Sequence, residues 1–244
     1  MSENRKVTPS SLLRMKRRGE KITLLTACDF PIAAFINQAG IDIVLVSDAV
    51  GTVGNGRPEA VSVSVDEMIY HTQAVRNGAG NSMVVTTLPF GSYETHDQAL
   101  ETAVRLMKEG GADAVHFEGT RAKAEMVKAI ADAGIPVLGH IGITKQKIVR
   151  SGTFRIQGRT AESAQQILSD VIAFTEAGAF GLILECIPTR LGEIIAQSID
   201  IPVIGIGAGP RVDGQALVTQ DMLGMYKELS PRFLKVYIDL NEVI

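Results

Sequence analysis

The sequence predicts an α/β fold, a (β/α)8 TIM barrel in which parallel strands alternate with helices. Three observations predict it. Short apolar runs alternate with stretches of helical periodicity along the whole chain. Glycines recur where a helix must stop before the next buried strand, as in Ala39-Gly40-Ile41 and Ala133-Gly134-Ile135. The length of 244 residues is close to the roughly 250 residues typical of one such barrel.

The first predicted element is a helix over Thr8–Gly19. Pro9 suits the first helical position, Leu12, Leu13 and Met15 form an apolar stripe, and Gly19 ends the helix. We expect this helix to cap the bottom of the barrel.

The strands and helices that follow alternate regularly. Strands are predicted at Lys21–Ala27, Asp42–Ser47, Met83–Thr87, Ala112–Phe117, Pro136–Gly139, Gly181–Glu185 and Pro202–Ile206, with a weaker last run near Leu217. Helices are predicted from Pro31 to Gly40 and at Val65–Asn77, Asp97–Glu109, Arg121–Ala133, Ala161–Ala177 and Arg190–Gln197. The number of predicted strands is about eight, which is the number that closes a barrel. Residues 1–244 are therefore predicted to form a single barrel domain with an N-terminal capping helix. An open doubly wound sheet remains the competing layout.

Composition and charge give no sign of nucleic-acid or membrane binding, so small-molecule chemistry is the default expectation. The chain is 45% hydrophobic and 21% charged, with a net charge of -3 and acids and bases interspersed. Nucleic acid or an anionic membrane would require a concentrated basic patch. The N-terminus lacks an apolar core of signal-peptide length, and no apolar run approaches the roughly 20 residues that span a bilayer. Cys28 and Cys186 are expected to be reduced and buried, so we expect a soluble, cytoplasmic protein.

Three acids follow apolar runs, at the strand ends where barrel active sites lie: Asp48, Glu118 and Glu185. Any one of them could serve a local structural purpose. Together they predict one pocket in which a hard divalent cation such as Mg²⁺ binds over a small 2-oxo acid. The cation would stabilise an enolate, and Glu185 could remove the proton from the carbon next to the keto group.

Histidines lie near the same strand ends. His116 shares a strand face with Glu118, and as a metal ligand it would favour Zn, Mn or Fe over Mg. His140 could contact a ligand or be a hydrogen-bonded structural histidine, and His71 is expected at the surface or in packing.

Two connections between predicted elements are unusually long, and a third is rich in glycine. The loops Asp48–Ser64 and Gly142–Arg159 are longer than packing requires; the first could be a lid, and the second is basic. The run Ile204–Gly209 is read as a tight barrel-top turn rather than a dinucleotide loop.

With these residues assembled, the chain resembles the ketopantoate hydroxymethyltransferase family over nearly its whole length. The resemblance depends on the motifs Thr26-Ala27-Cys28-Asp29, Tyr70-His71-Thr72, Leu88-Pro89-Phe90, Gly139-His140-Ile141-Gly142, Gln157-Gly158-Arg159, Leu184-Glu185-Cys186-Ile187-Pro188 and Pro202-Val203-Ile204-Gly205-Ile206-Gly207-Ala208-Gly209.

The resemblance implies a barrel of the phosphoenolpyruvate-mutase-like superfamily. It also implies Mg²⁺, 5,10-methylenetetrahydrofolate as co-substrate, and a homo-oligomer, commonly a decamer. The reaction would add a hydroxymethyl group to 3-methyl-2-oxobutanoate, giving 2-dehydropantoate. Carried over, the proton acceptor matches Glu185, the metal ligands match Asp48 and Glu118, and the substrate-binding positions are Asp48, Ala49, Thr87 and His116.

This sequence departs from the family pattern in that pocket. Thr87 replaces an aspartate metal ligand, His116 replaces a lysine that pairs with the substrate carboxylate, and Ala49 replaces a serine, which leaves its backbone amide. The chain also ends at Ile244, before the C-terminal helical extension usual in the family. Two alternatives therefore stay open: a divergent metal-dependent aldolase or lyase acting on another 2-oxo acid, and a catalytically silent paralogue.

Overall fold

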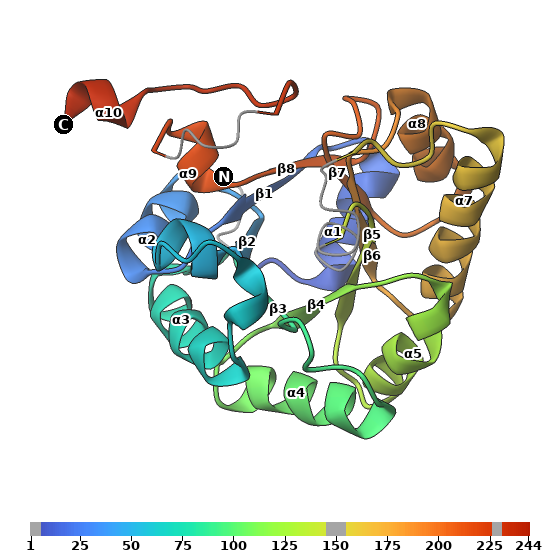
Figure 1. Ribbon diagram of the computed structural model, residues 1–244, viewed down its shortest axis with the longest axis horizontal. Coiled ribbons are helices and arrows are strands. Elements are labelled where there is room, and N and C mark those ends of the chain that lie inside the picture. The colour runs from blue at the N-terminus through green and yellow to red at the C-terminus, as the bar shows by residue number, and fades with distance from the viewer. Residues whose placement is uncertain (1–5, 145–154, 226–230) are drawn as a thin grey trace.

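The computed structural model describes residues 6–144, 155–225 and 231–244. Eight parallel strands form a closed barrel in sequence order, with β8 pairing back onto β1 (Figure 1). The strands are β1 (Ile22–Thr26), β2 (Ile43–Val46), β3 (Met83–Thr87), β4 (Ala114–Glu118), β5 (Val137–Gly142), β6 (Gly181–Glu185), β7 (Val203–Ile206) and β8 (Gly214–Leu217). The predicted barrel is confirmed, and the open-sheet alternative is wrong.

Helices form an outer ring around the strands (Figure 1). They are α2 (Phe30–Gln38), α3 (Val65–Gly78), α4 (His96–Lys108), α5 (Ala124–Asp132), α7 (Ala161–Glu176) and α8 (Thr189–Ser198). The short helices α9 (Thr219–Met222) and α10 (Leu240–Val243) follow β8. No helix within the described ranges is both long and apolar enough to cross a membrane.

Two apolar cores hold the fold together. The larger fills the layer between the strands and the helical ring. The smaller lies inside the barrel, where inward-facing residues of the strands meet, among them Ile22, Met83 and Ile204.

Helix α1 (Pro9–Arg18) contacts the interior core at the amino end of the strands. The side chain of Thr8 accepts a hydrogen bond from the Ser11 amide at its start, and Gly19 ends it at a φ of 69°. Leu12 is fully buried within the interior core. The Lys16 ammonium donates to the Asp213 carboxylate at 2.8 Å and to two backbone carbonyls. The helix is therefore fixed to the barrel by both apolar and ionic contacts.

Some predicted boundaries differ from the structure. Strand β5 runs to Gly142 instead of ending at Gly139, so His140 lies within a strand. The residues Arg121–Lys123 form a 3-10 turn, and the helix begins only at Ala124. Cys28 was predicted to be buried but is only half-buried, whereas Cys186 is buried as expected; both are free thiols.

The predicted lid over Asp48–Ser64 contains two short helical turns, a π-helical turn at Val50–Gly54 and a 3-10 turn at Ala60–Ser62. The second long loop, Gly142–Arg159, lies largely outside the described residues, as do its basic residues Lys145, Lys147 and Arg150.

Candidate active site

A cavity of about 150 Å³ opens at the carboxyl end of the strands. Its polar lining comes from Thr26, Ser47, His116, Glu118, His140, Thr144 and Glu185. Its apolar floor includes Leu24, Leu45, Ile183 and Ala216, which belong to the interior core. The barrel core thus continues directly into the floor of the cavity.

Strand register brings the polar side chains together. His116 is the pairing partner of Thr87 on β3, Glu118 that of His140 on β5, and Gly142 that of Glu185 on β6. His116 and Glu118 are two residues apart on β4, so both face the barrel interior. Four neighbouring strands, β3 to β6, therefore supply these side chains.

A chain of close contacts links Thr87 to Glu185 through two imidazoles. Thr87 Oγ1 lies 2.9 Å from His116 Nδ1, and His116 Nε2 lies 3.0 Å from His140 Nδ1. His140 Nε2 lies 3.0 Å from Glu185 Oε2. All members except Glu185 are buried, so these contacts are shielded from water and strengthened accordingly.

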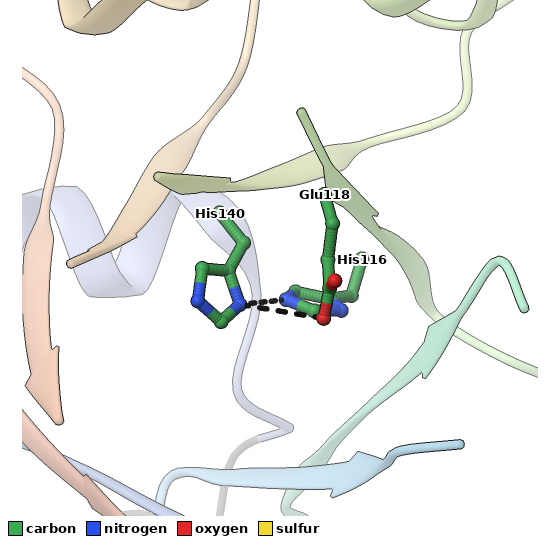
Figure 2. Close-up of side chains that lie close together, drawn as sticks. All are labelled: His116, Glu118 and His140. Atoms are coloured by element: carbon green, nitrogen blue, oxygen red, sulfur yellow. Dashed lines mark hydrogen bonds and ion pairs between the residues drawn. The ribbon is translucent and has the colours of Figure 1, made fainter. Parts of the chain in front are cut away.

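Glu118 joins the same cluster. Its Oε1 lies 3.8 Å from His140 Nδ1. Among the described residues, His116, Glu118 and His140 form a group whose metal-ligating atoms all lie within 4.8 Å of one another. Figure 2 shows the three side chains converging from β4 and β5. This group has the ligand types of a metal site.

The other predicted site residues occupy different positions. Asp48 is buried in the turn after β2, between Ser47 and Ala49, which both line the cavity; the Ser47 hydroxyl donates to its Oδ1 at 3.3 Å. Thr87 is fully buried and contacts the site through His116. Glu118 and Glu185 face the cavity as predicted. A metal role for Asp48 stays a prediction.

Unusual backbone conformations lie beside Glu185. Gly142 has a φ of 118°, and a Cβ added there would lie 2.2 Å from the Glu185 carbonyl oxygen. Cys186 has a φ of 53°, a left-handed conformation that is rare outside glycine. Its amide donates to the Ile206 carbonyl at 2.9 Å. The carboxylate is thus placed by a backbone held on both sides.

The cysteines are unsuited to nucleophilic chemistry. Burial, and then the charge of Glu185, raises the pKa of the Cys186 thiol to about 12. Burial and the neighbouring Asp29 raise the pKa of Cys28 to about 11. Because the thiolate is the nucleophile, both residues are inert near neutral pH. The site is therefore one of carboxylates and imidazoles.

Sequence reasoning missed the hydroxyls of Ser47 and Thr144 and left His140 undecided. A polar residue at the end of a predicted strand was the available signal for Ser47. Thr144 lies two residues beyond β5, and the prediction ended that strand too early to indicate it.

This sequence is similar to one family of known proteins along almost its whole length. A family profile described as ketopantoate hydroxymethyltransferase matches residues 6–244. The 3-methyl-2-oxobutanoate hydroxymethyltransferase of Moorella thermoacetica is 46% identical over 99% of this chain and 90% of its own length. The enzyme of the same name from Clostridium botulinum is 45% identical over 97% of this chain and 86% of its own length.

Solved structures share the fold at low identity. Phosphoenolpyruvate phosphomutase from Streptomyces platensis has a TM-score of 0.66 and 14% identity, covering 87% of this chain and 81% of that chain. Phosphonopyruvate hydrolase, solved with oxalate and Mg²⁺, has a TM-score of 0.64 and 14% identity over 86% and 80%. The 2,3-dimethylmalate lyase of the PEP mutase/isocitrate lyase superfamily has a TM-score of 0.61 and 15% identity over 85% and 80%. This chain therefore shares the barrel fold of these structures.

Proposed function

The chain belongs to the ketopantoate hydroxymethyltransferase family, and we propose that it transfers a hydroxymethyl group to 3-methyl-2-oxobutanoate. The donor would be 5,10-methylenetetrahydrofolate and the product 2-dehydropantoate. The observation that supports the proposal is the 3.0 Å contact between the Glu185 carboxylate and His140 at the wall of a small cavity.

The cavity suits a small keto acid. Its volume of about 150 Å³ is below the roughly 300–1,000 Å³ of sites for drug-sized ligands. The apolar floor offers Leu24 and Ile183 to the branched alkyl group of the substrate, and the polar wall offers His116 and Glu118 to its oxygens.

Glu185 is proposed as the base. Its carboxylate would take the proton from the carbon next to the keto group, and the His140 imidazole, whose Nε2 lies 3.0 Å from Oε2, would lie beside that carboxylate. The enolate carbon would then bond to the methylene carbon of the donor as one of its two carbon-nitrogen bonds breaks. The oxygen of water would bond to the same carbon as the second carbon-nitrogen bond breaks. The proton taken from the substrate and one proton of that water would end on the two nitrogens of the released tetrahydrofolate.

A divalent cation is part of the proposal, because the group around Glu118 has ligand chemistry suited to one. Such an ion would supply Lewis-acid stabilisation of negative charge. Mg²⁺, present in phosphonopyruvate hydrolase, takes oxygen ligands. Two imidazoles beside one carboxylate fit it poorly, and Asp48 would have to contribute a second oxygen.

A second candidate is an aldolase or lyase reaction on another 2-oxo acid. The observation that favours it is the contact of Thr87 with His116. The family resemblance implies an aspartate at Thr87 and a lysine at His116, and neither residue present has a fixed charge. The group that would pair with the substrate carboxylate is therefore a histidine instead of a lysine.

We further propose a homo-oligomer in the cytoplasm. Large apolar side chains are exposed on adjacent helices, with Phe35 of α2 65% and Tyr70 of α3 69% exposed. Exposed large apolar side chains on neighbouring helices suit an interface between subunits.

The test is proton-deuterium exchange at the carbon next to the keto group, followed by NMR over a panel of 2-oxo acids. We expect metal-dependent exchange of 3-methyl-2-oxobutanoate in the wild type and a drop of about 100-fold or more in Glu185→Gln. Glu176→Gln, an exposed position on α7, is the matched control and should retain exchange.

Different outcomes separate the candidates. Preference for another acid, with formaldehyde replacing the folate donor, would favour the aldolase reaction. Absence of exchange for every acid with each metal supplied would contradict both proposals. Deuterium exchange at the wild-type rate in Glu185→Gln would contradict the proposal that Glu185 is the base.

A further inference from the structure

We propose that His116, Glu118 and His140 form a two-histidine, one-carboxylate site for a borderline transition-metal ion such as Zn²⁺, Mn²⁺ or Fe²⁺, in preference to Mg²⁺. The inference deepens the proposed function, on which it rests for placing the substrate in the same cavity. Metal binding itself is independent of the reaction and is argued from the three side chains.

The ligand atoms already have spacings close to those around one ion. His116 Nε2 and His140 Nδ1 lie 3.0 Å apart, and Glu118 Oε1 lies 3.8 Å from His140 Nδ1. Two nitrogens each about 2.1 Å from a metal are separated by about 3.0 Å at a right angle and about 3.4 Å at the tetrahedral angle. Small side-chain rotations therefore suffice for binding.

Each imidazole contacts an oxygen through the ring nitrogen that faces away from the cluster, which leaves its other nitrogen available for a metal ion. Thr87 Oγ1 contacts His116 at Nδ1, which leaves Nε2 directed at the cluster. Glu185 contacts His140 at Nε2, which leaves Nδ1 directed at the same point. A metal-bound histidine commonly donates its other ring N–H to an oxygen, and that contact fixes its tautomer and orientation. Thr87 provides that oxygen for His116. For His140, the Glu185 carboxylate lies 3.0 Å from Nε2, and a rotation of its side chain would align it with the N–H.

With those tautomers, the two inward nitrogens point lone pairs at each other across 3.0 Å. Either a proton or a cation must occupy that gap. Without metal, the Thr87 hydroxyl can donate to His116, and His116 in turn to His140, so one hydrogen lies between the rings. A divalent ion bound to both nitrogens would lie to one side of the line between them and would take the place of that hydrogen bond.

The ligand types decide which ions bind. Imidazole nitrogen suits Zn, Fe and Mn, whereas Mg²⁺ keeps to carboxylate, carbonyl and water oxygens. Burial of all three side chains, each with 6% or less of its surface exposed, limits the water that Mg²⁺ retains when it binds. Three protein ligands also leave positions for the carboxylate and keto oxygens of a 2-oxo acid.

The experiment uses Co²⁺ as a spectroscopic probe on the full chain, stripped with chelator and without substrate. We expect one equivalent of Co²⁺ to give visible absorption bands, Zn²⁺ to displace it stoichiometrically, and millimolar Mg²⁺ to leave the bands unchanged. His116→Gln and His140→Gln should each weaken Co²⁺ binding by about 100-fold or more. That is beyond the roughly 10- to 100-fold expected for Thr87→Val, which removes an outer hydrogen bond.

His96→Gln is the matched control, because this histidine is exposed at the start of α4; its affinity for Co²⁺ should equal that of the wild type. Should a variant fail to fold, pulsed EPR of Cu²⁺-loaded wild type reports ligation directly, with two imidazole nitrogens expected.

Displacement of Co²⁺ by Mg²⁺, unchanged affinity in His116→Gln, or fewer than two coordinated imidazoles would overturn the inference. The outcomes also separate it from the proposed function. Tight Co²⁺ binding without exchange of any 2-oxo acid would contradict the function alone, whereas exchange supported by Mg²⁺ with no Co²⁺ site would contradict the metal assignment alone.

Discussion

At the scale of single residues, Gly142 controls where the Glu185 carboxylate lies. It has a positive φ, and an added Cβ would lie 2.2 Å from the Glu185 carbonyl oxygen and 3.0 Å from the Glu185 amide nitrogen. Both are backbone atoms, so no rotamer change can relieve the overlap. Only glycine, which has no Cβ, allows β5 to approach β6 this closely at this point.

We therefore expect Gly142→Ala to reduce deuterium exchange by about 100-fold, because a displacement near 1 Å of a reacting group has a cost of that order. Exchange rates and thermal unfolding of the variant would be measured together. Gly134→Ala is the matched control: its φ is 83°, but nothing lies within 4 Å of an added Cβ. Equal exchange rates in the two variants would contradict a positioning role for Gly142.

An acid near a strand is informative only when its end of the strand is known. Glu118 and Glu185 end predicted apolar runs, and both line the cavity. Asp42, Asp113 and Asp213 precede strands and have structural roles, since each accepts a backbone amide hydrogen bond from a neighbouring strand. Strand direction, which alternation with helices reveals, separates the two classes.

The contacts among the histidines could not be predicted in the same way. Whether His140 meets His116 or Glu185 depends on the register between β4, β5 and β6, which adjacent strands set through their backbones. A single sequence contains no direct record of that register. His140 therefore remained undecided between a ligand and a structural role.

At the scale of elements, the start of α3 anchors the connection that follows β2. The side chains of Ser64 and Glu67 each accept a hydrogen bond from the other's backbone amide, and the Arg57 guanidinium pairs with Glu67. The bonds from Arg57 and then Ser64 lower the pKa of Glu67 to about 2, from an ordinary value of 4.5. The loop that begins at Asp48 thus has its far end fixed by a charge.

Glu67→Gln keeps the hydrogen-bonding shape but removes the charge. Because the folded-state pKa is depressed, the charge contributes stability above about pH 4.5 and loses that contribution as the pH falls towards 2. We expect the free energy of unfolding of the variant to be about 1 kcal/mol lower than that of the wild type at pH 7. The difference should be smaller at pH 3, and urea titrations at the two pH values measure it. A difference independent of pH would contradict this assignment.

Element boundaries show where local signals mislead. The predicted strand ended at Gly139, whereas β5 runs to Gly142. Gly139 is instead a packing requirement inside the strand, since an added Cβ would lie 2.6 Å from the Phe174 ring. Conversely, Arg121 was predicted as helical, but its amide donates to Asp170 of α7 and the chain forms a 3-10 turn there. Both differences arise from tertiary contacts.

At the scale of the whole molecule, α1 completes the interior core at the amino end of the barrel. Leu12→Ala should lower the free energy of unfolding by about 2–5 kcal/mol, since it leaves a cavity that the surrounding strands cannot collapse to fill. Urea unfolding measures the change. Ile194→Ala, at a position 41% exposed on α8, should cost less than about 1 kcal/mol. Similar losses in both variants would contradict a core role for α1.

The fold as a whole was predictable because its signals repeat. Each βα unit has its own apolar run and stop, so an error at one boundary leaves the strand count intact. The weakest signal, near Leu217, belongs to β8, the strand that closes the ring. The site has no such redundancy, since each of its residues occurs once.

The seal that α1 forms at one end has a kinetic consequence. Among the described residues, the floor of the cavity is made of interior-core residues such as Leu24 and Ala216, so we expect molecules to enter and leave from the carboxyl end. A keto acid seated on that floor lies beneath any larger donor. We therefore expect compulsory ordering in steady-state kinetics, with the acid first to enter and its product last to leave.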